Sequence, residues 1–318
     1  MKRILRLFAS QEFVLLVVIV AIMAAVGWIN PRFLAERNLQ SIFLGNAYIA
    51  VAAIGMSMVI ISGNIDISVG SLIGVLATLS GTLAVNGVPV VLAWILPIGV
   101  SILVTTFMGI LVAYLRIPSI VVTLGMMSVL KGALIVATGG TWINDLPDGF
   151  QLAQMRPLSV PMPVWFMVIL TIGAAVWMKT SGFGRSIYAV GGNAEAARLS
   201  GIDRERTIVK VFAIHGLFVG IAAILFATQL SIIQSTVPPN LELTIITASV
   251  VGGVSILGGT GTVIGSTLAA ILIAAIASSL IFVNLSPYWL RSVQGVLILL
   301  TVLADLWRRQ RQRRGARS

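Results

Sequence analysis

Apolar residues run through this chain in long stretches that contain no Asp, Glu, Lys or Arg. A membrane-spanning helix needs about 20 mainly apolar residues, and Gly, Pro and Asn divide the longest stretches into segments of about that size. The pattern predicts ten spans, at residues 13–30, 46–62, 69–86, 90–115, 118–138, 163–179, 209–230, 244–257, 262–283 and 288–304. We therefore expect an all-α polytopic membrane protein that forms one domain over residues 1–318.

The composition supports a membrane protein and excludes a water-soluble enzyme. Apolar residues make up 58% of the 318 residues and charged residues only 10%, whereas a soluble domain has about 25% charged residues. Mean hydropathy is +1.04. The chain has no cysteine and a single histidine, His215, so thiol catalysis, disulfides and a multi-histidine metal site are also excluded.

The net charge of +11 is distributed unevenly along the chain. An even number of spans places both termini on one side, and the positive-inside rule makes that side cytoplasmic. This side collects 16 of the 21 Lys and Arg residues: Lys2, Arg3, Arg6, Arg116, Lys179, Arg185, Arg198, Arg204, Arg206, Lys210, Arg308, Arg309, Arg311, Arg313, Arg314 and Arg317. Residues 305–318 are then a basic cytoplasmic tail beside membrane lipid, and we expect no nucleic-acid partner.

The longest charged loop between two spans, 180–208, predicts a short helix outside the bilayer. Asn193 is a good N-cap for this helix, Glu195 lies in its first turn, where the helix dipole favours an acid, and Gly201 can end it. Gly182 and Gly184 allow a sharp turn where the chain leaves the membrane, and Asp203 can cap the next span. Composition leaves two roles open for the helix, a solvated connector or a surface that inserts into a cleft of a partner protein.

A single acid, Asp66, lies among apolar residues in the segment 62–71. An Asp at this depth is costly unless it caps a helix, pairs or meets water. One interpretation is that Asp66 or Ser68 caps the following span. The other is a broken helix whose Asn64 and Asp66 side chains line a cavity or meet a partner, and the two interpretations are compatible.

Glycines dominate the segment 251–266, where they can break a helix at membrane depth or allow close backbone contact. The candidates are Gly252, Gly253, Gly258 and Gly259. A Gly followed seven residues later by Gly-Ser occurs at Gly258 and at Gly63, which is a weak sign of internal duplication. A nucleotide-binding loop would need Gly-Lys-Ser/Thr, and none of the four lysines follows a glycine.

Few ionisable residues remain inside the predicted spans. Lys131 is near enough to a helix end to snorkel, and His215 suits a hydrogen-bonded packing role better than a proton relay. An ion-coupled secondary transporter should carry ionisable groups near mid-membrane, and a membrane enzyme needs a nucleophile–base pair or a metal site. The pattern therefore favours a passive pathway subunit. The outer loop 139–162, rich in Pro and Gly, suits docking of a soluble partner or serves as a connector.

Three of these segments resemble a known family. The pattern Glu195-Ala196-Ala197-x-x-x-Gly201 matches the first half of the EAA loop of bacterial ABC-importer permeases, without the Ile-x-Leu-Pro that completes it. The stretch 184–201, the segment around Asp66 and the glycine-rich segment are similar to those of ribose-type permeases. That subfamily also serves other pentoses, deoxyhexoses and the autoinducer-2 signal.

The resemblance implies a type II ABC-importer-like permease of the bacterial inner membrane that is not itself an enzyme. It implies that ATP and Mg²⁺ bind to a separate ATPase, usually one polypeptide with tandem domains, and that this chain binds no cofactor. It also implies a periplasmic sugar-binding protein and a second permease copy, identical or related. Relatives that import branched-chain amino acids or nucleosides are the alternative within the class.

The resemblance further implies two groups of functional residues. The first would couple the chain to the ATPase: Gly184, Arg185, Asn193, Glu195, Ala196, Ala197, Arg198 and Gly201. The second would line the translocation pathway or break its helices: Asn64, Asp66, Ser68, Gly252, Gly253, Gly258 and Gly259.

Overall fold

The computed structural model describes the backbone of residues 11–315 and the side chains of residues 11–307. Lys2, Arg3, Arg6 and the last three residues, which the sequence assigns to the cytoplasmic side, lie outside the described residues. The named elements of the described residues are all helices: α2 (Gln11–Ile29), η1 (Pro31–Leu34), α3 (Glu36–Ile61), α4 (Val69–Val85), α5 (Val90–Ala113), α6 (Ser119–Thr138), η2 (Leu152–Gln154), η3 (Pro157–Ser159), α7 (Met162–Thr180), α8 (Gly182–Gly192), α9 (Ala194–Leu199), α10 (Arg204–Ala227), α11 (Leu241–Val251), α12 (Val263–Phe282) and α13 (Trp289–Gly315).

A helix occupies each of the ten predicted spans, but among the described residues only eight helices are long and apolar enough to cross a membrane. The other two, α4 and α11, have 17 and 11 residues, so a count of ten spans is not confirmed. The chain turns at the glycine pair Gly252–Gly253, where Gly253 has a φ of +97°. For this reason α11 stops at Val251 and does not continue to residue 257 as predicted.

Two other helices extend beyond their predicted bounds. α3 begins at Glu36, ten residues before the predicted start at 46, and it carries its acidic residue in the first turn, where the helix dipole favours a negative charge. α13 continues to Gly315, through most of the residues expected as a tail. A helix can continue past the apolar part of its sequence because its backbone hydrogen bonds are internal.

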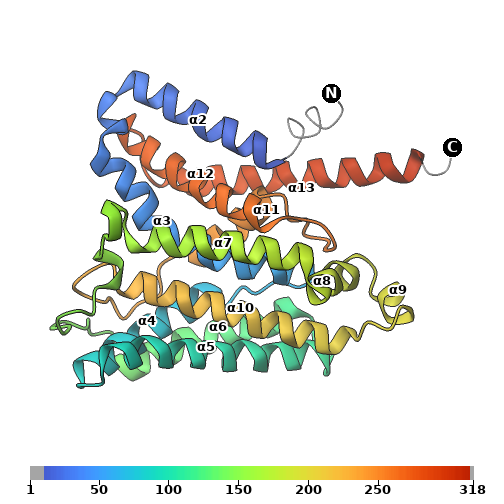
Figure 1. Cartoon of the computed structure of the whole chain (residues 1–318), viewed down its shortest axis with the longest axis horizontal. Helices are drawn as coiled ribbons and strands as arrows, with labels where there is room; N and C mark the ends of the chain where they lie inside the picture. Colours follow the sequence, from blue (N-terminus) through green and yellow to red (C-terminus); the bar gives the residue numbers. More distant parts are fainter. Residues whose placement is uncertain (1–10, 316–318) are drawn as a thin grey trace.

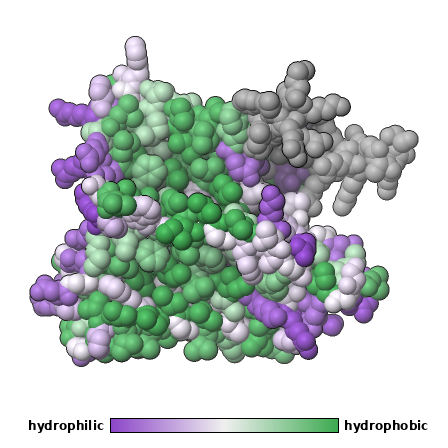
Figure 2. All heavy atoms as spheres, viewed as in Figure 1, coloured by the Kyte–Doolittle hydropathy of each residue, from purple (hydrophilic) through white to green (hydrophobic). Residues whose placement is uncertain are grey.

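The helices lie side by side with their axes roughly aligned (Figure 1). Side chains of α3 are almost all buried beyond its first turns, and α10 and α12 pack against it. α2 and α13 lie at the rim and expose apolar side chains. Hydrophobic side chains cover the middle of the face in Figure 2, and hydrophilic ones gather at both ends of the helices, as a bilayer with water on each side requires.

The loops form two separate faces at the ends of the helices. The first, here called the basic face, consists of the loops 62–68, 114–118, 181–203 and 252–262. The opposite face includes the loop 139–161 and the first part of the segment 228–240, which are joined by an antiparallel bridge between Ile143 and Ile233. The rest of that segment returns along α4, where Val237 lies beside Gly74 and Leu241 beside Gly70. The glycine-rich and Asp66 segments therefore lie on the same face as the charged loop.

Candidate functional site: the loops of the basic face

The charged loop contains two helices, α8 and α9, and not the single short helix expected. The predicted turn at Gly182 and Gly184 is wrong, because both glycines lie in the first turn of α8. The chain turns one residue earlier, at Ser181, whose hydroxyl accepts a hydrogen bond from the Gly184 N–H at 2.8 Å. Gly184 is required for close packing, since a Cβ there would overlap the carbonyl oxygen of Met178. Arg185 donates to the Thr180 carbonyl at 3.1 Å.

The caps predicted for the short helix are confirmed on α9. The Asn193 side chain accepts from the N–H groups of Glu195 and Ala196 at 3.1 and 3.0 Å. At the other end of α9, Gly201 has a φ of +80°. The Gly201 N–H donates to the Arg198 carbonyl at 3.0 Å, and the Ile202 N–H donates to the Ala197 carbonyl at the same distance. This is a Schellman stop. Asp203 then caps α10 by accepting from the Arg206 N–H at 2.8 Å.

α9 buries Ala197, half-buries Ala194 and exposes its other residues. Ala197 faces inward, whereas Ala196 is exposed and Leu199 is 78% exposed. Glu195 and Arg198 form an exposed ion pair at 2.6 Å, and the hydrogen bond from Arg198, together with its charge, lowers the pKa of the Glu195 carboxyl. Because a lowered pKa keeps the carboxylate charged above that value, this pair persists at neutral pH and is lost only on acidification. The exposed face thus presents a small residue and a large apolar residue one turn apart.

The end of α8 meets the backbone of two distant segments, the one after α3 and the one before α12. We call this contact the glycine junction and define it as Ile61, Gly63, Gly191, Gly258 and Gly259. The Gly259 N–H donates to the Ile61 carbonyl at 2.8 Å. A Cβ on Gly191 would overlap that same carbonyl oxygen, and one on Gly258 would come within 2.7 Å of the Gly191 oxygen. The end of α8 is therefore in direct backbone contact with the ends of both glycine-containing segments.

A side chain of α8 adds a second link to the glycine-rich loop. The Tyr188 hydroxyl donates to the Gly261 carbonyl at 2.9 Å, and partial burial raises the pKa of Tyr188 above its usual value. The hydroxyl therefore keeps its proton, and the hydrogen bond, across the physiological pH range.

The two other candidate glycines, Gly252 and Gly253, lie outside the glycine junction. A Cβ on Gly252 would overlap the N–H of Ser266 at the start of α12, and one on Gly253 would come within 2.7 Å of the Gln11 side chain. These two glycines break the helix between α11 and α12, where the chain must pass close to α12 and α2. The structure does not bring them together with Gly258 and Gly259.

Asp66 and Ser68 are fully buried, so neither lines an open cavity here. One carboxylate oxygen of Asp66 accepts from the Ser68 N–H at 2.7 Å and from its hydroxyl at 2.6 Å, just before α4. The other oxygen lies 3.1 Å from Nε2 of His215 on α10. The predicted side-chain cap is wrong, because the N-cap residue of α4 is Ser68 and it makes no side-chain cap hydrogen bond, while the Asp66 carboxylate accepts from Ser68 ahead of the helix. Of the three conditions that make a buried Asp tolerable, Asp66 meets the second, because it pairs.

The pairing of Asp66 with His215, 149 residues away, is absent from the sequence prediction. His215 is fully buried, and among the described residues its Nδ1 has no hydrogen-bond partner. Nδ1 faces Gly55 of α3, where a Cβ would approach it to 2.8 Å. The sequence held one signal for this pairing, because Asp66 and His215 each lie in an apolar segment and buried polar groups need hydrogen-bond partners.

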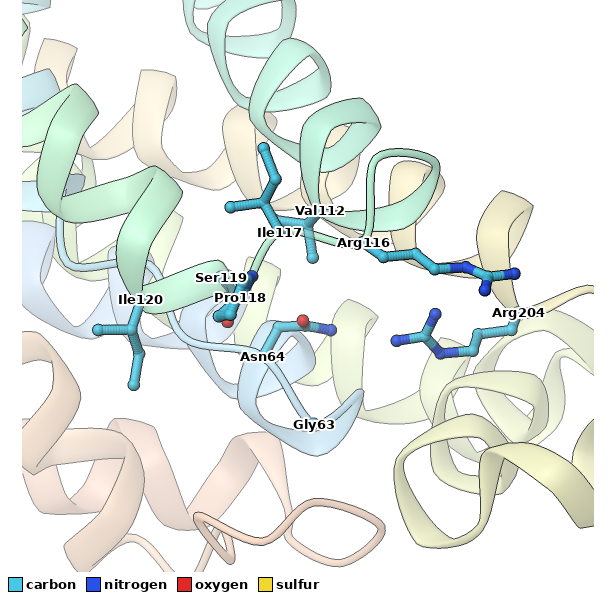
Figure 3. Close-up of a pocket in the computed structure, with 9 residues that line it drawn as sticks. All are labelled: Gly63, Asn64, Val112, Arg116, Ile117, Pro118, Ser119, Ile120 and Arg204. Carbon is cyan, nitrogen blue, oxygen red and sulfur yellow. The ribbon is translucent and has the colours of Figure 1, made fainter.

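Asn64 is buried and lines a pocket of about 370 Å³ at the basic face. Its amide donates to the Ser62 hydroxyl at 3.1 Å. The pocket is lined by residues from the break after α3, the loop before α6 and the start of α10 (Figure 3): Gly63, Asn64, Val112, Arg116, Ile117, Pro118, Ser119, Ile120 and Arg204. Two arginines therefore face one pocket, which the sequence prediction also missed.

Comparison with known proteins places this arrangement in a family. A model of the family described as "Branched-chain amino acid transport system / permease component" matches residues 38–302. The autoinducer 2 import system permease protein LsrC of Salmonella typhi is 34% identical over 297 residues, covering 93% of this chain and 86% of the relative. The proteins of that name from Yersinia enterocolitica and Escherichia coli K12 are 34% and 32% identical over 302 residues, covering 93% of this chain and 82% and 87% of the relatives.

No solved structure matches the chain significantly, so the family assignment comes from sequence alone. The family match covers most of the chain, from the first turn of α3 into α13, and includes the loops of the basic face. We conclude that this chain belongs to the family of transport-system permease components and is a multi-pass membrane subunit of a transporter.

Proposed function

We propose that this chain is the pathway subunit of an ATP-driven importer of autoinducer 2 or a chemically similar sugar. The observation that carries the proposal is the identity of about a third over 93% of the chain to permeases named for autoinducer 2 import. A neutral sugar-like solute also fits a chain with few charges inside its spans. In this proposal a periplasmic binding protein delivers the solute to the face opposite the basic face, and two permease copies enclose the pathway.

Uptake measurements test the solute and the energy source together. A strain that lacks the importer genes is complemented with them, and uptake of labelled autoinducer 2, ribose and leucine is compared. We expect uptake of autoinducer 2 or a sugar that stops when the ATPase is made catalytically inactive and that continues when the proton gradient is collapsed. Uptake of leucine alone would favour the branched-chain amino acid alternative, and uptake that depends only on the gradient would favour a secondary transporter.

The basic face is the surface that we assign to the ATPase, here proposed to be one polypeptide with tandem domains that holds the ATP and Mg²⁺. The concentration of Arg and Lys on this face supports a cytoplasmic location, with both termini on the same side. α9 projects from it with Ala196 and Leu199 exposed. Burying an exposed leucine side chain stabilises an association by about 1.5–3 kcal/mol, so Leu199 is the expected apolar contact of α9.

The glycine junction gives this docking a route into the membrane part of the chain. α9 follows α8 with only Asn193 between them, and α8 contacts the carbonyl of Ile61 and the loop at Gly258 through backbone atoms. A displacement of α9 by the ATPase is therefore transmitted through backbone contacts to the loops 62–68 and 252–262, without passing through flexible side chains. Close-packed backbone has little room to absorb such a displacement.

A charge at Ala196 is expected to uncouple uptake from the ATPase. Ala196→Glu places a carboxylate on the exposed face of α9, where it must be desolvated on docking, and uptake should fall by about tenfold or more, since an unpaired buried charge costs several kcal/mol. Ala196→Ser, which adds little volume and no charge, is the matched control and should keep uptake. Both uptake and co-purification of the ATPase are measured. Normal uptake by an assembled Ala196→Glu complex would contradict the docking role of α9.

A further inference from the structure

The pocket beside Asn64 is lined by two arginines. Arg116 follows the end of α5, and Arg204 is the first residue of α10. Both side chains line the pocket, where they lie alongside each other and point in opposite directions, with the Arg204 guanidinium toward Asn64 (Figure 3). Within residues 11–307, neither forms an ion pair with a carboxylate. Of the two acids adjacent in sequence to Arg204, Asp203 is paired with Arg206 at 3.1 Å, and the charge of Glu205 acts on Arg198.

Other groups around the pocket can donate hydrogen bonds to an anion. The Ser119 hydroxyl accepts from the Ile65 N–H at 3.2 Å, which leaves its own proton free to donate. α6 starts at Ser119 after Pro118, and the first N–H groups of a helix have no partner within the helix and favour negative charge. Arg116 has a φ of +56°, a conformation that costs energy for a residue with a Cβ. Two cations, a hydroxyl and a helix start thus converge on one pocket.

The surroundings of the pocket indicate which anion it receives. Leu115 is 63% exposed, Ile120 is 46% exposed and Val121 is 58% exposed, and these three residues flank the arginine and the start of α6. In a membrane-spanning chain such side chains contact acyl chains. A basic pocket between membrane helices on the cytoplasmic side is typical of an anionic lipid headgroup site, and arginine binds a phosphate group through two parallel hydrogen bonds.

We propose that this pocket binds the phosphate group of an anionic phospholipid from the leaflet at the basic face, with Arg116 and Arg204 as its two cationic contacts. The proposal rests on the proposed function only for the side of the membrane on which the basic face lies. The bound lipid would bridge the loop before α6 and the start of α10, and so hold α10, which follows α9, against the rest of the membrane part.

Lipid titration of the purified full chain tests the proposal without ATPase or solute, so its outcome is independent of the transport assays. The chain in neutral detergent is titrated with phosphatidylglycerol, with phosphatidylcholine and with inorganic phosphate, and thermal stability and native mass spectrometry report binding. We expect phosphatidylglycerol to bind and stabilise the chain, and the other two to have little effect. Equal stabilisation by phosphatidylcholine or by inorganic phosphate would overturn the assignment to an anionic lipid.

A pair of double variants identifies the residues. Arg116→Gln with Arg204→Gln should weaken phosphatidylglycerol binding by about tenfold or more, because two charge-assisted contacts are lost. Lys179→Gln with Lys210→Gln removes the same charge from exposed positions of the basic face, and this control should change binding by no more than about twofold. Equal loss in both pairs would show a nonspecific effect of charge. A loss of ATPase association without a change in lipid binding would assign the arginines to the protein partner, and either result overturns the proposal.

Discussion

Replacing Asp66 by alanine is expected to lower the free energy of unfolding by about 3–5 kcal/mol, the usual cost of removing one partner of a buried pair. The change leaves Nε2 of His215 without its partner at 3.1 Å, beside an Nδ1 that already has none among the described residues. It also removes the acceptor of the Ser68 N–H and hydroxyl at the start of α4. Thermal denaturation of the purified chain in detergent measures the effect.

Two controls separate the pair from a general effect of losing an acid. Asp148→Ala removes an exposed carboxylate from the loop of the opposite face and should change stability by less than about 0.5 kcal/mol. The double variant Asp66→Ala with His215→Ala should cost less than the sum of the two single variants, because partners in contact are coupled by about 0.5–3 kcal/mol. Strict additivity of the two single effects would contradict the pairing.

Substituting neighbouring glycines of α8 is expected to have opposite effects. In a helix, replacing Gly by Ala normally stabilises by up to about 1 kcal/mol, and Gly192→Ala should behave this way, since the nearest atom to its Cβ is the Gly259 Cα at 3.8 Å. Gly191→Ala should be destabilising, since its Cβ would overlap the Ile61 carbonyl oxygen and disrupt the 2.8 Å hydrogen bond from Gly259. Thermal denaturation of both variants tests the sign.

The same pair tests the proposed transmission through the glycine junction. Gly191→Ala should reduce uptake by about tenfold or more while the assembled complex still hydrolyses ATP. The reason is that the added Cβ displaces α8 and so changes the contact that links α9 to α3. A tenfold loss of uptake corresponds to about 1.4 kcal/mol. Gly192→Ala should retain uptake. The ratio of solute transported to ATP hydrolysed is the measurement. An assembled Gly191→Ala complex with an unchanged ratio would exclude the junction as the route of coupling.

Local sequence determined most of the secondary structure of this chain. The apolar segments place a helix at each predicted span, because an amide backbone in lipid must satisfy its hydrogen bonds internally. The caps Asn193, Gly201 and Asp203 act on N–H and carbonyl groups within a few residues. Such interactions are encoded in the few residues that make them, so they could be predicted one by one.

Where the local signals failed, packing against distant residues was responsible. Glycine was expected to turn the chain at Gly182 and Gly184, yet these residues are helical, because Ser181 makes the turn and Gly184 is needed for contact with Met178. The glycine-rich segment was expected to break a helix, which it does, but the contact of Gly259 with Ile61 could not be anticipated. A glycine in the sequence is compatible with a turn, with a helix break and with a close contact between two backbone segments, so it does not show which of these occurs.

The hydrophobic pattern thus determined by itself that the chain is a bundle of membrane helices with one charged loop, and short-range capping determined where α9 begins and ends. Only the tertiary structure decided that Asp66 meets His215, that the end of α8 touches two other glycine-containing segments, and that Arg116 and Arg204 share a pocket. The physical reason is distance along the chain: these partners are separated by tens to hundreds of residues, and nothing in the periodicity of either segment specifies which helix packs beside it.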